Sequence, residues 1–540
     1  MIKGVLENGK RFFSKQETSI FSAAAMIALA MAGSALLGIW RDRLLYAKFF
    51  AVNPGQLDVY NAAFKLPDTL FQLLISGALS AAFIPVFSEW IDKNKKKANR
   101  IASVMLNWLL IIFIGLGLLI YLWARPLSQL ITADFSFDQI NLMTTLVRLL
   151  LVAQLFLLMS NFLTGILHSH QRFILPALAP IIYNLGIIGG ILFLSDRFGI
   201  FGPAIGVIIG AAGHFIIQIP LLKMLHFSFR PFYFELSDPA MKKIITLMVP
   251  RNLALIVCEI EMMVTIYWAT GMGKGALSLF YLAQHLSQLP IRLVGATIGQ
   301  ATLPAFSHQR FRNGFASFKN LLCKTLSQTI YLIFPVTVIF LVLRLPLVRL
   351  AFGAKQFPWQ ATIVTGQVLA ILSVTIFCQT ISEILRRAFY AMNDTKTVLI
   401  IDVIGVIVNL GLVFVSVATG RGNLLWLAAG LSFSRAVKFF LLLWFLEKKI
   451  TAFIVADTLI KGVKMAFSAF MAALLTWLSM KVMDRFIFNT SYVIPLLFVT
   501  GISGLVGLVV YVGFSRLLRI KEFFQFFHLA QNLFRKTKAC

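Results

Sequence analysis

The stretch from Ile101 to Ala124 reads IASVMLNWLLIIFIGLGLLIYLWA and contains no charged side chain. A helix needs about 20 predominantly apolar residues to cross the hydrocarbon core of a bilayer, so this stretch is long enough to span it. Similar apolar runs recur along the whole chain, for example at 397–419 and 491–515. The sequence therefore predicts a protein that crosses a membrane many times.

The composition supports this interpretation. Apolar types make up 59% of the 540 residues and charged types 13%, and Phe alone occurs 51 times. A water-soluble domain cannot bury that much apolar surface, because a single core stops growing near about 250–300 residues. The runs are also longer than the strands of a β-barrel, which have about ten residues. Because backbone groups facing lipid must be paired within their own segment, we predict an all-α polytopic membrane protein with about fourteen transmembrane helices.

The basic residues indicate the orientation of the chain. The formal net charge is +28, and Lys and Arg are concentrated in alternate connections between the predicted spans. Such clusters occur at 93–100, at 242–243 and at 448–449. This asymmetry is typical of the positive-inside pattern, and it predicts that both termini lie in the cytoplasm. Because the charge follows the topology, we expect no nucleic-acid partner.

The chain contains a weak internal repeat. The segment LPDTLFQLLISGALSAAFIPVFSEW (66–90) resembles LPIRLVGATIGQATLPAFSHQR (289–310), and Asn-Leu-Gly recurs at 184–186 and 409–411. Both offsets contain six spans, so the two copies share one orientation and are related by an axis along the membrane normal. We therefore predict a cytoplasmic N-terminal segment (1–17), an N-lobe of six spans (18–225), a C-lobe of six spans (226–450), two extra spans (451–515) and a basic amphipathic cytoplasmic tail (516–540) that faces anionic lipids.

Residues for catalysis or cofactor binding are not evident. The four cysteines lack CxxC or metal-ligand spacing, and no glycine-rich phosphate loop occurs in the connections. The longest predicted external connection (125–142) has only Asp134 and Asp138 as acidic residues. We therefore expect no catalytic residues, metal site or cofactor, and this sequence does not favour a membrane-bound enzyme or scaffold.

Several motifs resemble those of one family. They are Leu37-Gly-Ile-Trp-Arg-Asp42, Asp58 followed by Ala63-Phe-Lys-Leu-Pro67, Gly77-Ala-Leu-Ser-Ala-Ala-Phe-Ile-Pro85, Gln218-Ile-Pro220 and Asp394-Thr-Lys-Thr397 with Asn409. In order and spacing, from about residue 20 to 450, the chain is similar to the MurJ lipid II flippases of the MOP exporter superfamily. The resemblance implies two six-helix lobes and a lipid-linked, pyrophosphate-bearing substrate.

The chain departs from the family at three arginines that are thought to hold the pyrophosphate. In the first span Ser34 is followed by Ala35, no basic residue occurs at 69–72, and the eighth span carries His285 instead. We expect Arg41 and Lys65 to face a central cavity as phosphate donors, positioned by Asp42 and Asp58, because a guanidinium matches two phosphate oxygens. Two further residues are candidates for binding the substrate in place of the missing arginines, namely Arg251 and, as its pH-dependent partner, His285.

Acidic residues in the spans are candidates for a coupling ion, Na⁺ or H⁺. Glu259 and Glu261 lie about 200° apart around one helix, so only one of them can face a cavity. Asp402 and Asn409 are seven residues apart and share a face of another span. Because some family members have a sodium site between spans seven, eleven and twelve, we expect one of the two glutamates to act with Asn409, and Asp402 is a further candidate. The alternative is that these residues form a structural hydrogen-bonded network. Three residues of the tenth span are candidates for a gate or an interface pair: Glu383, Arg386 and Arg387.

The leading hypothesis is a flippase for lipid II, an undecaprenyl-pyrophosphate-linked sugar–peptide. It would work by alternating access, as a monomer, driven by the membrane potential or a coupled cation, beside other cell-wall synthesis proteins. The altered arginines leave an alternative open, namely a flippase for another polyprenyl-linked oligosaccharide or a cation-coupled exporter of the same superfamily.

Overall fold

The structure is a computed structural model that describes residues 20–78, 83–225, 227–299, 302–303, 305–306, 314–353, 357–392, 394–420, 422–450 and 454–537. Every regular element in these ranges is a helix, which confirms the predicted fold class. The chain divides into two compact units: residues 1–278 with 354–357, and residues 279–353 with 358–540. Helix α13, which the sequence repeat assigns to the second lobe, belongs to the first unit by its contacts. The six-plus-six repeat remains a prediction.

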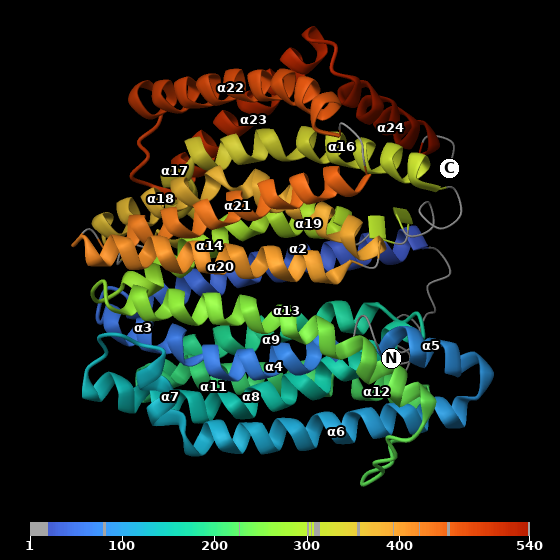
Figure 1. Cartoon of the computed structure of the whole chain (residues 1–540). Helices are drawn as coiled ribbons and strands as arrows, with labels where there is room; N and C mark the ends of the chain where they lie inside the picture. Colours follow the sequence, from blue (N-terminus) through green and yellow to red (C-terminus); the bar gives the residue numbers. More distant parts are fainter. Residues whose placement is uncertain are drawn as a thin grey trace, which may run out of the picture. The chain divides into compact units, whose positions relative to one another are not determined.

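The first unit contains the helices up to the turn after α13. They are α2 (Ile20–Phe49), α3 (Pro54–Ala63), α4 (Lys65–Ala78), α5 (Ile84–Lys93), α6 (Lys95–Leu122), α7 (Ala124–Leu130), α8 (Phe137–Ser169), α9 (Ile174–Gly189), the π-helix η2 (Gly190–Leu194), α10 (Ser195–Phe198), α11 (Phe201–Ile216), α12 (Ile219–Met224) and α13 (Pro239–Thr270). Figure 1 shows α6, α8 and α11 side by side in this unit.

The second unit contains the remaining helices. They are α14 (Ala276–Pro290, whose first residues fall in the first unit), η3 (Ile291–Ala296), α16 (Gly314–Val342), α17 (Arg344–Phe352), α18 (Trp359–Val374), α19 (Ile376–Ala391), α20 (Thr395–Ala418), α21 (Leu424–Ile450), α22 (Ile454–Phe486), α23 (Val493–Leu517) and α24 (Lys521–Thr537). The last two predicted spans form the pair α22 and α23, which pack against α16.

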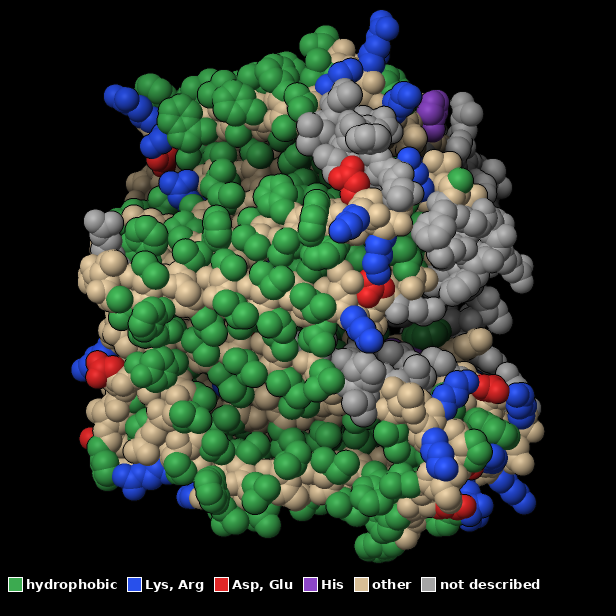
Figure 2. All heavy atoms as spheres, in the orientation of Figure 1, with side chains coloured by type: hydrophobic (Ala, Val, Ile, Leu, Met, Phe, Trp, Pro, Cys, Tyr) green, Lys and Arg blue, Asp and Glu red, His purple; other side chains and the backbone are tan. Residues whose placement is uncertain are grey.

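The surface is apolar along the middle of the helices, as a lipid solvent requires. Figure 2 shows hydrophobic side chains over these parts, with Lys and Arg gathered near helix ends. Nine helices in the described part of the chain are long and apolar enough to cross a membrane, and the α18–α19 pair, bent by 42°, makes a tenth. Each predicted span coincides with a helix or a run of helices. The structure therefore confirms a polytopic membrane protein, and the number fourteen stays a prediction.

Prolines and glycines explain where the helices are broken or closely packed. The π-turn η3 follows Pro290 directly, since proline removes a backbone donor and forces a local change of register. Helices α9 and α11 approach so closely that a Cβ at Gly186 would lie 2.4 Å from the Cα of Gly210. The same holds at Gly206, whose added Cβ would lie 2.7 Å from the carbonyl oxygen of Gly186. Small residues allow this contact, which is a common way of packing helices in membranes.

The C-terminal helix α24 is amphipathic and packs on the second unit. Phe526 stacks on Tyr331 of α16 with ring centroids 5.8 Å apart, and Gln525 accepts a hydrogen bond from Gln328. On its other face Phe524 and Phe527 are 40% and 49% exposed. One side of the helix is therefore fixed to the protein, and the other presents aromatic side chains outward.

Candidate functional site

Arg41 and Asp42 lie near the end of α2, against α9. The Nε and Nη2 groups of Arg41 donate to Oδ1 of Asp42 at 2.8 and 2.6 Å, and Nη1 donates to Oδ1 of Asn184 at 3.1 Å. The Asn184 amide in turn donates to the backbone oxygen and the hydroxyl of Ser34. The Arg41 side chain is 21% exposed, and these hydrogen bonds hold its guanidinium in one orientation. Asp42 positions Arg41, as the sequence predicts.

Lys65 lies at the start of α4 and pairs with α13. Its Nζ is 2.5 Å from Oε2 of Glu259, and the hydroxyl of Thr69 donates to the same oxygen at 2.8 Å. The Lys65 side chain is 8% exposed and that of Glu259 is 20% exposed. Lys65 is therefore not positioned by Asp58, contrary to our expectation. Glu259, a candidate for binding the coupling ion, is the partner of a lysine.

Asp58 has a structural position instead. Its carboxylate accepts hydrogen bonds from the backbone N–H of Gly275 at 2.5 Å, and from the N–H and hydroxyl of Ser278 at 2.8 and 2.7 Å. Gly275 has φ +90°, a conformation that favours glycine. Asp58 thus ties α3 to the turn between α13 and α14, because a carboxylate is a pure acceptor that satisfies several N–H groups at a tight turn.

Arg251 and His285 are the two residues that we expect to replace the family arginines. The side chain of Arg251 lies outside the described residues. His285, on α14 of the second unit, is exposed, and its ring centroid lies 6.4 Å from that of Tyr281. Their roles in binding an anion remain predictions.

Two ion pairs of the second unit involve residues of α19 and α20. Nη2 of Arg386 lies 2.7 Å from Oδ1 of Asp402, whose side chain is only 4% exposed. Arg387 and Glu383 form an ion pair of 3.9 Å along α19. Asp402, predicted as a coupling-ion ligand, is therefore a partner of a predicted gate residue.

The two other candidates for a coupling ion occupy different environments. Asn409 is 2% exposed on α20 and faces α21, where a Cβ at Gly430 would lie 3.3 Å from its Oδ1. Glu261 is partly buried on α13. In the described part of the chain, no three His, Cys, Asp or Glu side chains converge to hold a metal ion.

Two features were missed by the sequence reasoning. Lys438 on α21 is 7% exposed, and its aliphatic stem lies on Gly405 of α20, where an added Cβ would be 1.9 Å from the lysine Cε. In the first unit, Asp68 of α4 accepts a hydrogen bond from the side-chain amide of Gln154 in α8. The sequence does contain a signal for Gln154, because a polar residue near the middle of an apolar span must find a partner inside the protein.

The polar connection between α19 and α20 is fixed by one acidic residue. Asp394 caps α20, accepting a hydrogen bond from the N–H of Thr397 at 3.1 Å, and forms an ion pair with Lys449 at the end of α21. Partial burial works against ionisation, but the hydrogen bonds from Lys449 and Thr397 hold the pKa of Asp394 below its usual value.

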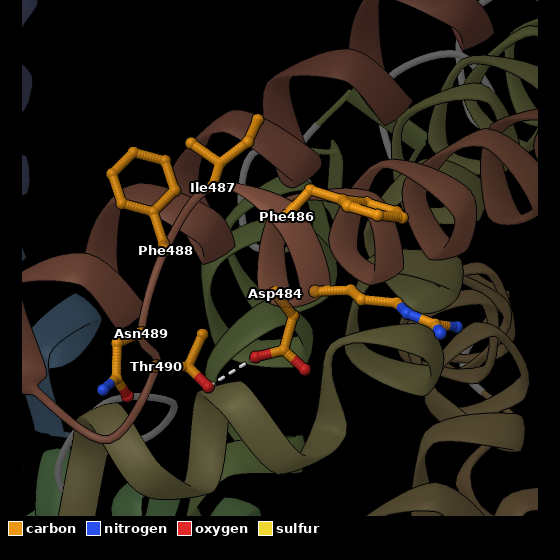
Figure 3. Close-up of a pocket in the computed structure, with 7 residues that line it drawn as sticks. Asp484, Phe486, Ile487, Phe488, Asn489 and Thr490 are labelled. Atoms are coloured by element: carbon orange, nitrogen blue, oxygen red, sulfur yellow. Dashed lines mark hydrogen bonds between the residues drawn. The ribbon is translucent and has the colours of Figure 1, made fainter.

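The pocket in Figure 3 lies elsewhere, at the end of α22 and in the connection that follows it. It has a volume of about 470 Å³ and is lined by residues 484–490, of which 484–486 are the last residues of α22. The hydroxyl of Thr490 donates to Asp484 at 2.5 Å. Because one short segment at the end of α22 and in the following connection forms it, and the buried ion pairs are not part of it, this pocket is not a candidate for the substrate site.

Comparison with known proteins identifies the family. The family described as "Lipid II flippase MurJ" matches residues 46–497, which is most of the chain. This protein belongs to the MurJ family. The match includes the elements that carry Asp58, Lys65, Glu259 and Asp402, and it ends within α23.

Individual relatives agree with this assignment. The chain is 26% identical over 401 residues to the probable lipid II flippase MurJ of Bdellovibrio bacteriovorus, covering 73% of this chain and 76% of that protein. It is 26% identical over 376 residues to the lipid II flippase MurJ of Burkholderia cenocepacia, covering 67% and 72%.

Solved structures show the same fold. A MurJ lipid II flippase in an inward closed conformation superposes with a TM-score of 0.74 and 24% identity, over 92% of this chain and 98% of that one. An inward-facing MATE family multidrug transporter of the MOP superfamily gives 0.66 at 16% identity, over 79% and 98%. At these identities the likeness shows the fold alone, which is that of a polytopic membrane protein.

Proposed function

We propose that this protein carries lipid II from the inner to the outer leaflet of the bacterial inner membrane. The observation that carries the proposal is the match to the lipid II flippase family over residues 46–497. It favours lipid II over another polyprenyl-linked oligosaccharide or an exported drug. A polar headgroup cannot cross hydrocarbon unaided, because desolvating its charges costs many kcal/mol. The protein therefore has to supply a polar path while the lipid tail remains in the bilayer.

Arg41 is the residue best suited to contact the pyrophosphate in the first unit. A guanidinium has five N–H donors, and the bonds to Asp42 and Asn184 use three of its N–H groups. The rest remain for an anion, and the carboxylate fixes the plane in which they point. Lys65, Arg251 and His285 are the further cationic candidates. Lys65 supports this role less, since Glu259 already neutralises it.

Transport by alternating access fits a protein of this fold and superfamily, and the membrane potential can drive it. Moving negative charge outward gains about 2.3 kcal/mol per charge per 100 mV of inside-negative potential. The distribution of Lys and Arg supports cytoplasmic termini. With that orientation, the exposed Phe524 and Phe527 of α24, next to basic residues, are suited to the surface of the cytoplasmic leaflet and its anionic lipids. We expect the chain to act as a monomer.

The test is complementation of a bacterial strain depleted of its own lipid II flippase. We expect growth to be restored and lipid II to become accessible at the outer surface. Arg41→Lys keeps the charge and the pair with Asp42 but loses the guanidinium fork, so it should reduce the exposure of lipid II. The matched control is Arg125→Met, which removes an exposed arginine. If the wild-type chain reaches the membrane and lipid II stays inaccessible, the proposed substrate is wrong.

A further inference from the structure

The first unit contains a cluster in which negative side chains outnumber positive ones. We call it the Lys65 cluster; it consists of Lys65, Asp68, Thr69, Gln154 and Glu259. Lys65 is already paired with Glu259 at 2.5 Å. Asp68 interacts electrostatically with both of these residues, but no ion pair joins it to a cation in the described part of the chain. The cluster therefore has two carboxyl groups and one ammonium group.

The hydrogen bonds of Gln154 indicate the protonation state of this additional carboxyl group. Gln154 is 3% exposed and lies near the middle of α8, a candidate membrane span. Its Nε2 donates to Oδ1 of Asp68, whereas its Oε1 is buried and has no hydrogen-bond partner among the described residues. Exchanging the amide oxygen and nitrogen would not help, because the oxygen would then face a carboxylate oxygen.

A protonated Asp68 resolves this mismatch. A neutral carboxylic acid offers one O–H donor and one carbonyl acceptor, and a primary amide offers the complementary acceptor and donor. The two groups can therefore form a cyclic pair with two hydrogen bonds, which satisfies both ends of the Gln154 amide. Protonation also removes a charge that no cation compensates at bilayer depth.

The other groups around Asp68 do not supply the missing positive charge. Tyr183 of α9 interacts electrostatically with Asp68 and is neutral. Arg41 is paired with Asp42. On α13, Glu261 is rotated by about 200° from Glu259 and is itself acidic. The basic residues of α6 lie in its first turns, at 95–100, far from the membrane centre. The side chain of Arg251 is outside the described residues, so it enters the test below.

We propose that Asp68, held against Gln154 and beside the Lys65–Glu259 pair, is a proton-binding site, and that the transport cycle takes up and releases this proton. The proton site itself does not depend on the identity of the substrate, whereas its coupling to transport rests on the proposed function. The proton shuttles between water and Oδ2 of Asp68, and no other bond changes.

Infrared titration of the full-length protein in lipid bilayers tests the site directly. A protonated carboxylic acid has a carbonyl band that disappears when the group ionises. We expect such a band in the wild-type protein at acidic to neutral pH, its loss in Asp68→Asn, and its retention in Asp138→Asn, which removes an exposed carboxylate. Asparagine can pair with the Gln154 amide, so this variant should remain folded. A band that persists in Asp68→Asn would refute the site.

Changing the number of charges gives an independent readout that a purely structural role would not produce. In Glu259→Gln, Lys65 is released to compensate Asp68, so the band of Asp68 should titrate at a lower pH. In Lys65→Met, both carboxyl groups lack a cation, so the band should increase to two groups. Arg251→Ala should leave the band unchanged. A titration that moves only in Arg251→Ala would show that Arg251 compensates Asp68, and the proposal would be wrong.

The coupling is tested by reconstituted flipping of lipid II at a series of pH values. We expect flipping by the wild-type protein to depend on pH, and this dependence to be flattened in Asp68→Asn but not in Asp138→Asn. The same dependence in all three proteins would refute the coupling. If no protein flips lipid II while the infrared band still responds as expected, the proposed function is refuted and the proton site is supported.

Discussion

Replacing Gly186 by alanine should separate two helices that are in backbone contact. The new Cβ would lie 2.4 Å from the Cα and 2.5 Å from the N of Gly210, whereas ordinary Cβ contacts begin near 3.4 Å. Helices α9 and α11 must therefore move apart by about 1 Å, and overpacking of this kind costs about 1–3 kcal/mol. Alanine has a higher helix propensity than glycine by up to about 1 kcal/mol, which offsets only part of that loss.

The same helix contains a matched control. Gly189 lies three residues further along α9, and a Cβ there would meet nothing within 4 Å. We expect Gly189→Ala to leave the apparent melting temperature of the purified protein unchanged or slightly raised. Gly186→Ala should lower it by several degrees, as measured by thermal denaturation in detergent with loss of the monodisperse peak. Equal melting temperatures for the two variants would contradict the close packing of α9 on α11.

Two further changes test the second unit. Gly405→Ala should destabilise the protein by about 1–3 kcal/mol, because the new Cβ would displace the buried stem of Lys438, and Gly411→Ala on the same helix, with nothing within 4 Å, should not. Asp394→Asn keeps an oxygen that can cap α20 but loses the charge facing Lys449, which is 44% exposed, so the loss at neutral pH should be at most about 1 kcal/mol. Because the pKa of Asp394 is lower in the folded protein, its ionised carboxylate stabilises the fold above the unfolded-state pKa of about 3.9. This stabilisation is lost as the pH falls through the folded-state pKa. The melting temperatures of the variant and the wild type should therefore converge in acid and not at alkaline pH.

The sequence predicted the fold well because lipid imposes a simple rule on it. Apolar runs of sufficient length must be helical, and each predicted span corresponds to a helix or a run of helices. The pair formed by Arg41 and Asp42 was also predictable, since the residues are adjacent in the chain. The partners across helices were not. Lys65 bonds to Glu259, almost two hundred residues away, because α13 packs on α4, and a sequence pattern contains no information on which neighbour a helix chooses.

Asp58 illustrates a second limit of sequence reasoning. An acidic residue seven positions before a lysine suggests an ion pair on one helix face, since such positions lie two turns apart. The structure instead breaks the run between α3 and α4 at Phe64, and Asp58 binds backbone N–H groups of a distant turn. Backbone donors are invisible in a sequence, so a carboxylate that satisfies them cannot be distinguished from one that serves a substrate.

The contact between Lys438 and Gly405 has a consequence for how this chain can evolve. No side chain fits at position 405 while a lysine stem occupies the space beside it. If Lys438 lost its packing contact with α20, its charged group would have to take another position inside the membrane. The two positions are therefore expected to change together or not at all, and among relatives of this protein a larger residue at the first should accompany a shorter one at the second.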